Sequence, residues 1–325
     1  MANGNVNDHY PLSQGGTEGD RLALQYIATK KAFGWAQPYP DSVDIANAHA
    51  ILDLAAGSCV WILDIASHPL VRPRVRRPSS TDTDEEGIRL YACDLTAAKF
   101  PPQALFDKAG VQAFEHDVTK PFPEELYGKF DLIHMGLVVL ALRPAEWAAA
   151  LANVHTLLKP GGTFWSVDND PVFHPPSESL ESVERNGHGV PACMEGDTWI
   201  QKYNSVYTRT VMRNGTYYDL SFRLPDLLAQ AGLTLTHARR CIGAFGRCGD
   251  IAPVLATEYA HTADNSDALH AVMANAAFAR GELEAPAGHR ITTVEEKEAL
   301  AREMHVGVRE EGAYIVLHEH VAVKN

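Results

Sequence analysis

The feature that most constrains this chain is a short apolar run that contains a carboxylate and leads into a turn of small residues. The run AILDL occupies positions 50–54, and AAGSC follows at positions 55–59. A continuous apolar run of this length is typical of a buried strand in a parallel sheet. A turn of small residues at the carboxyl end of such a strand lets a ligand approach the backbone closely. The sequence therefore predicts a nucleotide-like ligand after the first strand of an open α/β sheet.

The composition of the turn separates two kinds of ligand. A dinucleotide-binding turn has three glycines, which bring backbone N–H groups and a helix N-terminus against a pyrophosphate. Only Gly57 is present here, with Ala55 and Cys59 where neighbouring glycines would stand. S-adenosylmethionine carries no phosphate, and a carboxylate such as Asp53 attracts its sulfonium and ammonium charges. We therefore expect S-adenosylmethionine rather than a nicotinamide dinucleotide.

Two more carboxylates follow the next apolar runs of the chain. Asp94 ends the run at 89–94, where a carboxylate can accept hydrogen bonds from both hydroxyls of a ribose. Asp117 follows the run at 111–116, where it can receive the amino group of adenine. These positions extend the nucleoside hypothesis from one turn to three predicted strand ends.

The order of these residues, and the segments that follow them, resemble the class I S-adenosylmethionine-dependent methyltransferases. The residues concerned are Asp53, Gly57, Asp94 and Asp117, followed by KFDLIH at 129–134 and LLKPGG at 157–162. The leader around Tyr10 and Arg21, and the W-x-x-D spacing of Trp61 and Asp64, are similar to the fungal secondary-metabolism methyltransferases. The resemblance extends from Tyr10 to the last predicted strand.

This resemblance implies a donor site for S-adenosylmethionine, with S-adenosylhomocysteine as the product. The residues that it assigns to the donor are Tyr10, Arg21, Asp53, Ala55, Gly57, Asp94, Leu95, Asp117, Val118 and His134. Ala55 and Cys59 depart from the glycines of the usual turn and narrow the space for the methionine tail of the donor. Tyr26 stands where this group commonly has histidine.

Composition limits the partners and the compartment. The chain has 325 residues and a formal net charge of −13, which disfavours broad contact with nucleic-acid phosphates. We interpret the arginine-rich stretch within 71–86 as a solvated loop. The five cysteines include no C-x-x-C pair, so we expect neither zinc nor a disulfide framework, and a reducing cytoplasmic location. We find no signal peptide or membrane-spanning run and expect no membrane partner.

The pattern of apolar runs predicts a single domain over 1–325, with a doubly wound, Rossmann-like α/β sheet of seven strands. The predicted strands are 50–54, 89–94, 111–116, 130–135, 162–168, 233–240 and 313–323. The helices predicted with these strands are 18–34, 58–67, 101–109, 144–157 and 223–232.

Three segments outside this alternation are expected to be helical. They are an N-terminal segment at 1–35, an acceptor lid at 170–218 with a helix near 198–209, and an insertion at 251–308. The insertion has a capping-type helix start at 292–296. The lid contributes aromatic residues that can wall an apolar acceptor pocket, namely Phe173, Trp199, Tyr203 and Tyr207. The alternative is that these side chains only pack the lid helix.

The chemistry of methyl transfer limits which residues act on the acceptor. A hydroxyl acceptor must lose its proton, whereas a carboxylate is already ionised at neutral pH. Because imidazole titrates near neutrality, His134 and His174 are the candidate catalytic bases or acceptor-orienting residues. The alternatives are a packing role for His134 and a surface-loop position for His174.

One motif raises the question of a metal. Asp168-Asn169-Asp170 resembles the Asp-Asn pair with which catechol methyltransferases hold magnesium. Those enzymes need a further carboxylate after the fourth strand, where this chain has Met135 and Gly136. The oxygen shell that magnesium prefers would be incomplete, so we predict metal-independent action.

The sequence therefore predicts an O-methyltransferase that acts on a carboxyl or hydroxyl group of a small molecule, in secondary metabolism. Nitrogen and sulfur acceptors rank behind oxygen. A first alternative keeps the fold and the donor site but transfers no methyl group, as a cyclase or a regulatory protein. A second alternative is a nicotinamide oxidoreductase, which the single glycine of the turn disfavours. A homodimer is one assembly that the sequence leaves open.

Overall fold

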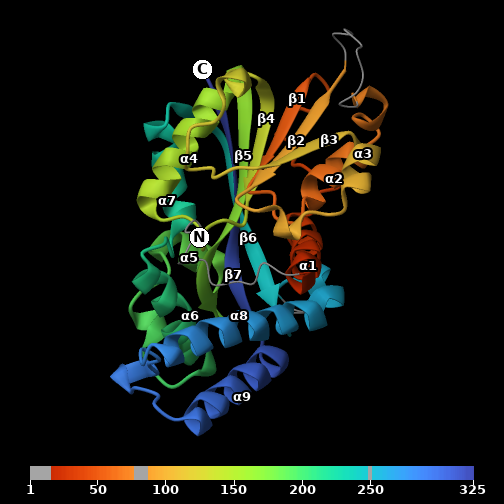
Figure 1. Ribbon diagram of the computed structural model, residues 1–325. Coiled ribbons are helices and arrows are strands. Elements are labelled where there is room, and N and C mark those ends of the chain that lie inside the picture. Colours follow the sequence, from red (N-terminus) through yellow and green to blue (C-terminus); the bar gives the residue numbers. More distant parts are fainter. Residues whose placement is uncertain (1–15, 77–86, 248–250) are drawn as a thin grey trace, which may run out of the picture.

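A mixed sheet of seven strands runs through the computed structural model, which describes residues 16–76, 87–247 and 251–325. The strands lie in the order β3-β2-β1-β4-β5-β7-β6, and β7 is antiparallel to both of its neighbours (Figure 1). Their bounds are β1 Ala50–Leu54, β2 Arg89–Asp94, β3 Val111–Glu115, β4 Phe130–Gly136, β5 Leu158–His174, β6 Leu233–Phe245 and β7 Ala313–Lys324. The predicted doubly wound α/β sheet is confirmed.

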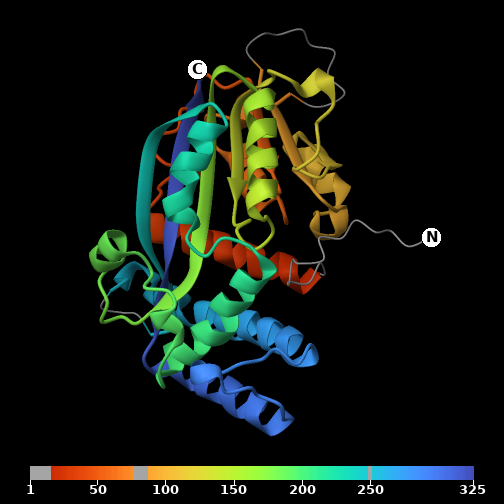
Figure 2. The same ribbon diagram turned by 90° about the vertical axis from the view of Figure 1, so that its left-hand side faces the viewer.

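Helices cover both faces of the sheet and also gather beyond one of its ends. The α-helices among the described residues are α1 Gly16–Phe33, α2 Val60–Ser67, α3 Gln103–Ala109, α4 Pro144–Leu157, α5 Leu180–Asn186, α6 Trp199–Asn214, α7 Leu220–Gln230, α8 Tyr259–Ala279 and α9 Val294–Glu310. Helices α2 and α3 lie on one face, and α4 and α7 on the other (Figure 1). Helices α6, α8 and α9 lie beyond the carboxyl ends of the parallel strands, and α1 crosses between α8 and the sheet (Figure 2).

The central strands alternate between two apolar cores. In β1, Ile51 packs in the core that contains Trp61 of α2, whereas Leu52 packs in the core that contains Trp147 of α4. Because successive side chains of a strand point to opposite faces, Asp53 lies on the same face as Ile51. The carboxylate within the apolar run is therefore on the α2 side of the sheet.

The fifth strand is longer than the sequence predicts. The prediction covers 162–168, whereas β5 has 17 residues. The antiparallel partner β7 explains the extension at the carboxyl end, because it pairs with β5 as far as Tyr314, opposite the last residue of β5. Pro171, which lacks an N–H group, lies where this pairing shifts its register. The first residues of the predicted lid at 170–218 are thus part of the sheet.

Local signals fix the starts of two helices beyond the sheet. The Thr293 side chain accepts the N–H of Glu296, and the Glu296 side chain bonds back to Thr293, so the capping box predicted at 292–296 is confirmed. Thr198 and Gln201 form the same arrangement at the start of α6. Among the described residues, no helix combines the length and the apolar character that crossing a bilayer requires.

The predicted solvated loop at 71–86 begins with ordered backbone contacts, which the sequence analysis did not predict. The Arg74 guanidinium donates hydrogen bonds to the carbonyls of Ala46 and Ala48 at 2.6 and 2.7 Å. Val75 forms an isolated bridge with Ile88. The rest of the predicted loop, 77–86, lies outside the described residues.

Helix α9 packs against α6 at a glycine. A Cβ atom at Gly307 would lie 2.3 Å from Cδ2 of Trp199, so the indole occupies the place of a side chain. Gly19 in α1 differs, because no atom of the described residues lies within 4 Å of an added Cβ atom there.

This contrast gives a matched pair of helix substitutions. Gly307→Ala should lower the free energy of unfolding by about 1–3 kcal/mol, because overpacking outweighs the helix propensity of alanine. Gly19→Ala should leave it unchanged or raise it by up to about 1 kcal/mol. Urea denaturation measures both values, and equal effects of the two variants would contradict the packing described for α9.

A buried histidine lies where α8 faces α6. His270 is 2% exposed, its ring contacts that of Tyr203, and its Nε2 has no hydrogen-bond partner among the described residues. Burial lowers the pKa of His270 from 6.5 to about 4. The unfolded chain therefore takes up this proton at a higher pH than the folded protein, so the folded state is favoured above the ordinary pKa.

The stability of the protein should reflect this histidine between pH 6.5 and 4. In this interval the unfolded state binds the extra proton. As the pH falls, the free energy of unfolding therefore decreases by about 1.4 kcal/mol per pH unit for one such group. His270→Phe should remove this contribution, which corresponds to about one bound proton. The free energy of unfolding should then change less steeply with pH in this interval. His289→Gln, at a side chain that is 65% exposed, is the control and should leave the slope unchanged. Identical slopes for wild type and His270→Phe would refute the assignment.

Candidate functional site

A cleft of about 830 Å³ lies at the carboxyl ends of β1, β2, β3 and β4. This volume is within the range of small-molecule sites, roughly 300–1,000 Å³. Most of the residues that the sequence analysis assigns to the donor line it, namely Asp53, Ala55, Gly57, Asp94, Leu95, Asp117, Val118 and His134. Arg21 lines a second, smaller cavity instead, and Tyr10 lies outside the described residues.

The turn after β1 holds three residues in the left-handed backbone region. Ala55, Gly57 and Cys59 have φ angles of 53°, 55° and 58°. This region costs a non-glycine residue about 1–2 kcal/mol, so Ala55 and Cys59 are strained. The Gly57 N–H donates a hydrogen bond to Asp94 Oδ2 at 2.8 Å, and a Cβ at Gly57 would lie 3.1 Å from Leu22 Cδ1. The turn is therefore hydrogen-bonded to the end of β2, and Leu22 of α1 packs closely against it.

The carboxylate of Asp117 is also oriented by its own segment. Asp117 Oδ1 accepts the N–H of Thr119 at 2.9 Å and the hydroxyl of Thr119 at 2.7 Å. These bonds form a local turn in which the side chain of an aspartate bonds two residues ahead. Asp94 and Asp117 thus enter the cleft as fixed hydrogen-bond acceptors from neighbouring strand ends.

Asp53 and His134 form a buried pair on adjacent strands. They are direct partners in the β1–β4 register, and His134 Nδ1 lies 2.8 Å from Asp53 Oδ1. The imidazole stacks on Trp61, with ring centroids 4.1 Å apart and an angle of 25° between the planes. Burial raises the pKa of Asp53, and the hydrogen bond with His134 opposes this shift. Asp53 Oδ2 is buried without a hydrogen-bond partner among the described residues.

Some large side chains of the cleft are absent from the sequence prediction. Trp165 is the β5 partner of His134, so the strand register was a usable signal for it. Trp35 donates its Nε1–H to Glu319 Oε2 of β7 at 3.0 Å, a contact between segments too far apart for any local signal. Leu137 follows β4 and has a φ of 58°. Its sequence neighbours in β4 do not indicate this left-handed conformation.

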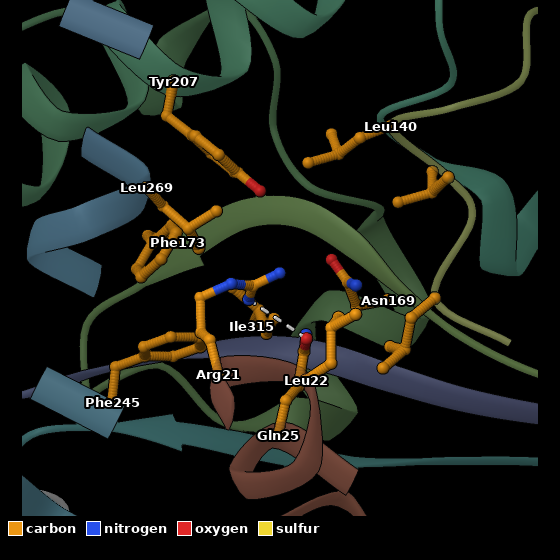
Figure 3. A pocket seen from close by; sticks show the side chains of 12 residues that line it. Arg21, Leu22, Gln25, Leu140, Asn169, Phe173, Tyr207, Phe245, Leu269 and Ile315 are labelled. Carbon is orange, nitrogen blue, oxygen red and sulfur yellow. Dashed lines mark hydrogen bonds between the residues drawn. The ribbon is translucent and has the colours of Figure 1, made fainter. Parts of the chain in front are cut away.

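A cavity of about 40 Å³ adjoins the cleft, and we call it the small cavity. Leu22 and Leu137 line both spaces and separate them. Phe173 of β5 and Tyr207 of α6, two of the predicted acceptor residues, line the small cavity together with Arg21 of α1 (Figure 3). The structure therefore brings part of the predicted lid next to the predicted donor site.

The other two predicted acceptor residues pack elsewhere. Trp199 packs against Gly307 of α9, and the Tyr203 hydroxyl donates to the carbonyl of Ser266 in α8 at 2.9 Å. Neither residue lines the cleft or the small cavity. Both side chains instead join α6 to the helices beyond the sheet.

His174 is buried in a chain of polar groups and lines neither space. Its Nδ1 lies 2.9 Å from Glu178 Oε2, and its Nε2 lies 2.9 Å from His188 Nδ1. His188 Nε2 continues the chain to Asp170 Oδ2 at 2.8 Å. Burial lowers the pKa of His174. The surface-loop alternative considered for His174 is wrong, because the end of β5 lies inside the sheet.

The carboxylates of the Asp168-Asn169-Asp170 segment are engaged by the protein itself. Asp168 accepts the N–H groups of Val138 and Asn169 at 2.8 Å each, and Asp170 Oδ1 accepts the N–H of Ser221 at 2.8 Å. Burial raises the pKa of Asp168 to about 7. Across 16–76, 87–247 and 251–325, no three or more His, Cys, Asp or Glu side chains are grouped to hold a metal ion.

The Asp53–His134 pair leads to a stability prediction. His134→Leu should lower the free energy of unfolding by about 3–5 kcal/mol, because it leaves the buried Asp53 carboxyl group without its partner. The double variant Asp53→Leu/His134→Leu should recover much of this loss, because two apolar side chains replace the pair. Chemical denaturation of both proteins checks this, and a double variant less stable than the single one would argue against a coupled pair.

Comparison with known proteins places the chain among distant relatives. No protein-family model matches it. The methyltransferase grgD of a Penicillium species is 28% identical over 121 residues, which cover 37% of this chain and 38% of that protein. The N-methyltransferase tcpN of Claviceps purpurea is 23% identical over 236 residues, which cover 71% of each. The chain thus spans well under half the length of the first of these two relatives.

Among solved structures, a partial likeness is found at low identity. Phosphoethanolamine N-methyltransferase 2 of Haemonchus contortus, in complex with S-adenosyl-L-methionine, is 13% identical with a TM-score of 0.44. The similarity covers 100% of this chain and 61% of that one.

Proposed function

The chain belongs to the class I S-adenosylmethionine-dependent methyltransferases, and we propose that it transfers a methyl group from S-adenosylmethionine to an oxygen of a small-molecule acceptor. One observation carries the proposal. The carboxylates Asp53 in β1, Asp94 at the end of β2 and Asp117 after β3 line one cleft together with the left-handed turn at Gly57.

The residues of the cleft fit this donor. Asp53 Oδ2 is a buried carboxylate oxygen without a partner in the described residues, and a cationic ligand beside it would offset the cost of that burial. Asp94 would accept the ribose hydroxyls, and Asp117 with Val118 would contact the adenine. The strained Ala55 and Cys59 leave a turn that suits a ligand without a pyrophosphate. When bound, the donor supplies a methyl group that its positive sulfur has already activated.

We propose that His134 accepts the proton of a hydroxyl acceptor. With Nδ1–H donating to Asp53, the imidazole presents a lone pair at Nε2. A Cβ at Gly136 would lie 3.3 Å from this Nε2, so the absence of a side chain there keeps the nitrogen uncovered. As the oxygen–methyl bond forms and the sulfur–methyl bond breaks to leave S-adenosylhomocysteine, the hydroxyl proton would pass to Nε2, and the Asp53 carboxylate would stabilise the imidazolium until solvent removes the proton.

Two other acceptor chemistries remain as outcomes of the test. A carboxylate needs no base, and an amine is favoured by one observation, namely that the relative tcpN is an N-methyltransferase. Phe173 and Tyr207 would wall the acceptor in each case. As the resemblance implies, we place the reaction in secondary metabolism. We place the protein in the reducing cytoplasm, with the free thiols of Cys59, Cys93, Cys193 and Cys241 in support.

Transfer of a labelled methyl group tests the proposal. The protein is incubated with S-adenosylmethionine labelled in its methyl group and with panels of phenols, carboxylic acids and amines. We expect label on a hydroxyl oxygen. Asp94→Asn should weaken the binding of S-adenosylhomocysteine by about tenfold, because it removes a charged hydrogen-bond acceptor. Asp107→Asn, on the exposed face of α3, is the matched control and should not change it.

The outcomes separate the alternatives. Label on nitrogen would replace the oxygen acceptor with an amine. Donor binding without label on any acceptor would favour the cyclase or regulatory alternative. Failure of S-adenosylhomocysteine to bind would refute the proposed function.

A further inference from the structure

We propose that Asp168 is a positioning residue for the donor, because its ionised carboxylate holds the segment 137–139, directly after β4, in the conformation that shapes the donor cleft. Binding of the donor should therefore require Asp168 to be ionised. Asp168 itself lines neither the cleft nor the small cavity, so it acts through the residues that it holds. The inference rests on the proposed function and adds a residue to it.

The segment after β4 forms part of the walls of both spaces. Leu137 and Val138 line the cleft, and Leu137 and Val139 line the small cavity. Figure 3 shows Leu140, the next residue, on the same side of the small cavity as Asn169 of β5. A change in the backbone of this segment would therefore alter the shape of the cleft.

The conformation of this segment depends on contacts with the end of β5. Leu137 has a φ of 58°, in the left-handed region, where a residue with a Cβ atom is strained. A strained residue of this kind needs neighbouring contacts that compensate for the strain. The Leu137 N–H donates to the carbonyl of Val167 at 2.8 Å, and the Val138 N–H donates to Asp168 Oδ2 at 2.8 Å. Both peptide groups that flank Leu137 are thus bonded to β5.

The carboxylate of Asp168 suits this task in its ionised form. It is fully buried, and it accepts the N–H groups of Val138 and Asn169 at 2.8 Å each. The N–H of Val139 also stabilises its negative charge. An ionised carboxylate is only an acceptor, whereas a protonated one carries an O–H donor in place of an acceptor position. Protonation would therefore weaken the hydrogen bonds that hold the segment 137–139.

The surroundings of Asp168 place its titration near neutral pH. Burial and the charge of Asp170 raise the pKa of Asp168 to about 7. The buried residues of α4 and α7, which cover this face of the sheet, are uncharged. The titratable and charged groups on this face, or hydrogen-bonded to them, are Asp170 of β5, His318 and His320 of β7, Arg240 of β6, and the chain of His188, His174 and Glu178 that ends at Asp170.

The neighbours of Asp168 on β5 and β7 keep their charge between pH 6 and 8. Burial lowers the pKa of His318 to about 4 and that of His320 to about 3, so both imidazoles are neutral there. Burial opposes the ionisation of Asp170, but its hydrogen bond with His188 outweighs this effect and lowers the pKa of Asp170. Asp168 is therefore the titrating group that contacts the segment 137–139 in this interval.

The direction of the pH dependence follows from the ionised fraction of Asp168. If only the protein with ionised Asp168 binds the donor, the apparent affinity is reduced by the fraction that is ionised. With a pKa of about 7, this fraction falls about tenfold between pH 8 and pH 6. The affinity should therefore be highest above pH 7 and should be lost as the pH falls. Binding at pH 6 should release about one proton, because it selects the ionised form.

Calorimetry of S-adenosylhomocysteine binding at pH 6 and pH 8 tests this inference. Wild type should bind about tenfold more weakly at pH 6 than at pH 8. Heats measured in two buffers of different ionisation enthalpy should show the release of about one proton per bound molecule at pH 6 and almost none at pH 8. Asp168→Asn keeps the shape of the side chain but not its charge. It should bind at pH 8 about as weakly as wild type binds at pH 6, and it should lose this pH dependence.

Asp131→Asn is the matched control. Asp131 Oδ2 also accepts two backbone N–H groups, those of His49 and Ala50 at 2.8 and 2.9 Å, but it lies near the amino end of β4. This variant should keep the tenfold pH dependence and the proton release of wild type. Circular dichroism shows whether each variant folds. If Asp168→Asn does not fold, the proton release of wild type at pH 6 decides the question.

The outcomes distinguish this inference from the proposed function. If wild type binds S-adenosylhomocysteine equally well at both pH values and releases no proton, the role of Asp168 is overturned and the proposed function stands. A tenfold pH dependence that persists in folded Asp168→Asn would belong to another group and would also overturn it. If wild type does not bind S-adenosylhomocysteine at either pH, the proposed function itself fails.

Discussion

The hydrogen bond from the Gly57 N–H to the Asp94 carboxylate is the contact on which the site depends. It ties the turn after β1 to the end of β2, and it does so across a turn with two non-glycine residues in the left-handed region. Such strain persists only where surrounding contacts determine the conformation. Leu22 of α1 closes the turn from the other side. The shape of the cleft at the central strand ends therefore follows from one buried polar contact and one apolar contact.

Most of the charged residues around the site line the cleft. The cleft is lined by Asp53, Asp94, Glu115, Asp117 and Glu146, with Lys99 and Lys120 as its basic residues, and Arg21 lines the small cavity. Leu22 and Leu137 form the apolar boundary between them. Asp168 supports this boundary because it accepts the N–H of Val138, directly after the left-handed Leu137. A cationic donor would meet the carboxylates of the cleft.

Local sequence patterns predict the sheet and most of the cleft. The strands and the capping box at Thr293 follow from periodicity and short-range signals, and Asp94 and Asp117 follow from their places at strand ends. The extension of β5 could not be predicted, because it depends on antiparallel pairing with β7, more than a hundred residues away. His174 illustrates the consequence: a lid histidine in the sequence is a buried strand residue in the structure. The aromatic lid residues could not be sorted either, since all four have the same character and only tertiary packing separates Phe173 and Tyr207 from Trp199 and Tyr203.

Calorimetric titration of the purified protein with S-adenosylhomocysteine and, separately, with NAD⁺ tests the central claim most directly. The account predicts saturable binding of the phosphate-free nucleoside at one site per chain and no measurable heat with NAD⁺. Tight binding of NAD⁺ with no binding of S-adenosylhomocysteine would contradict it.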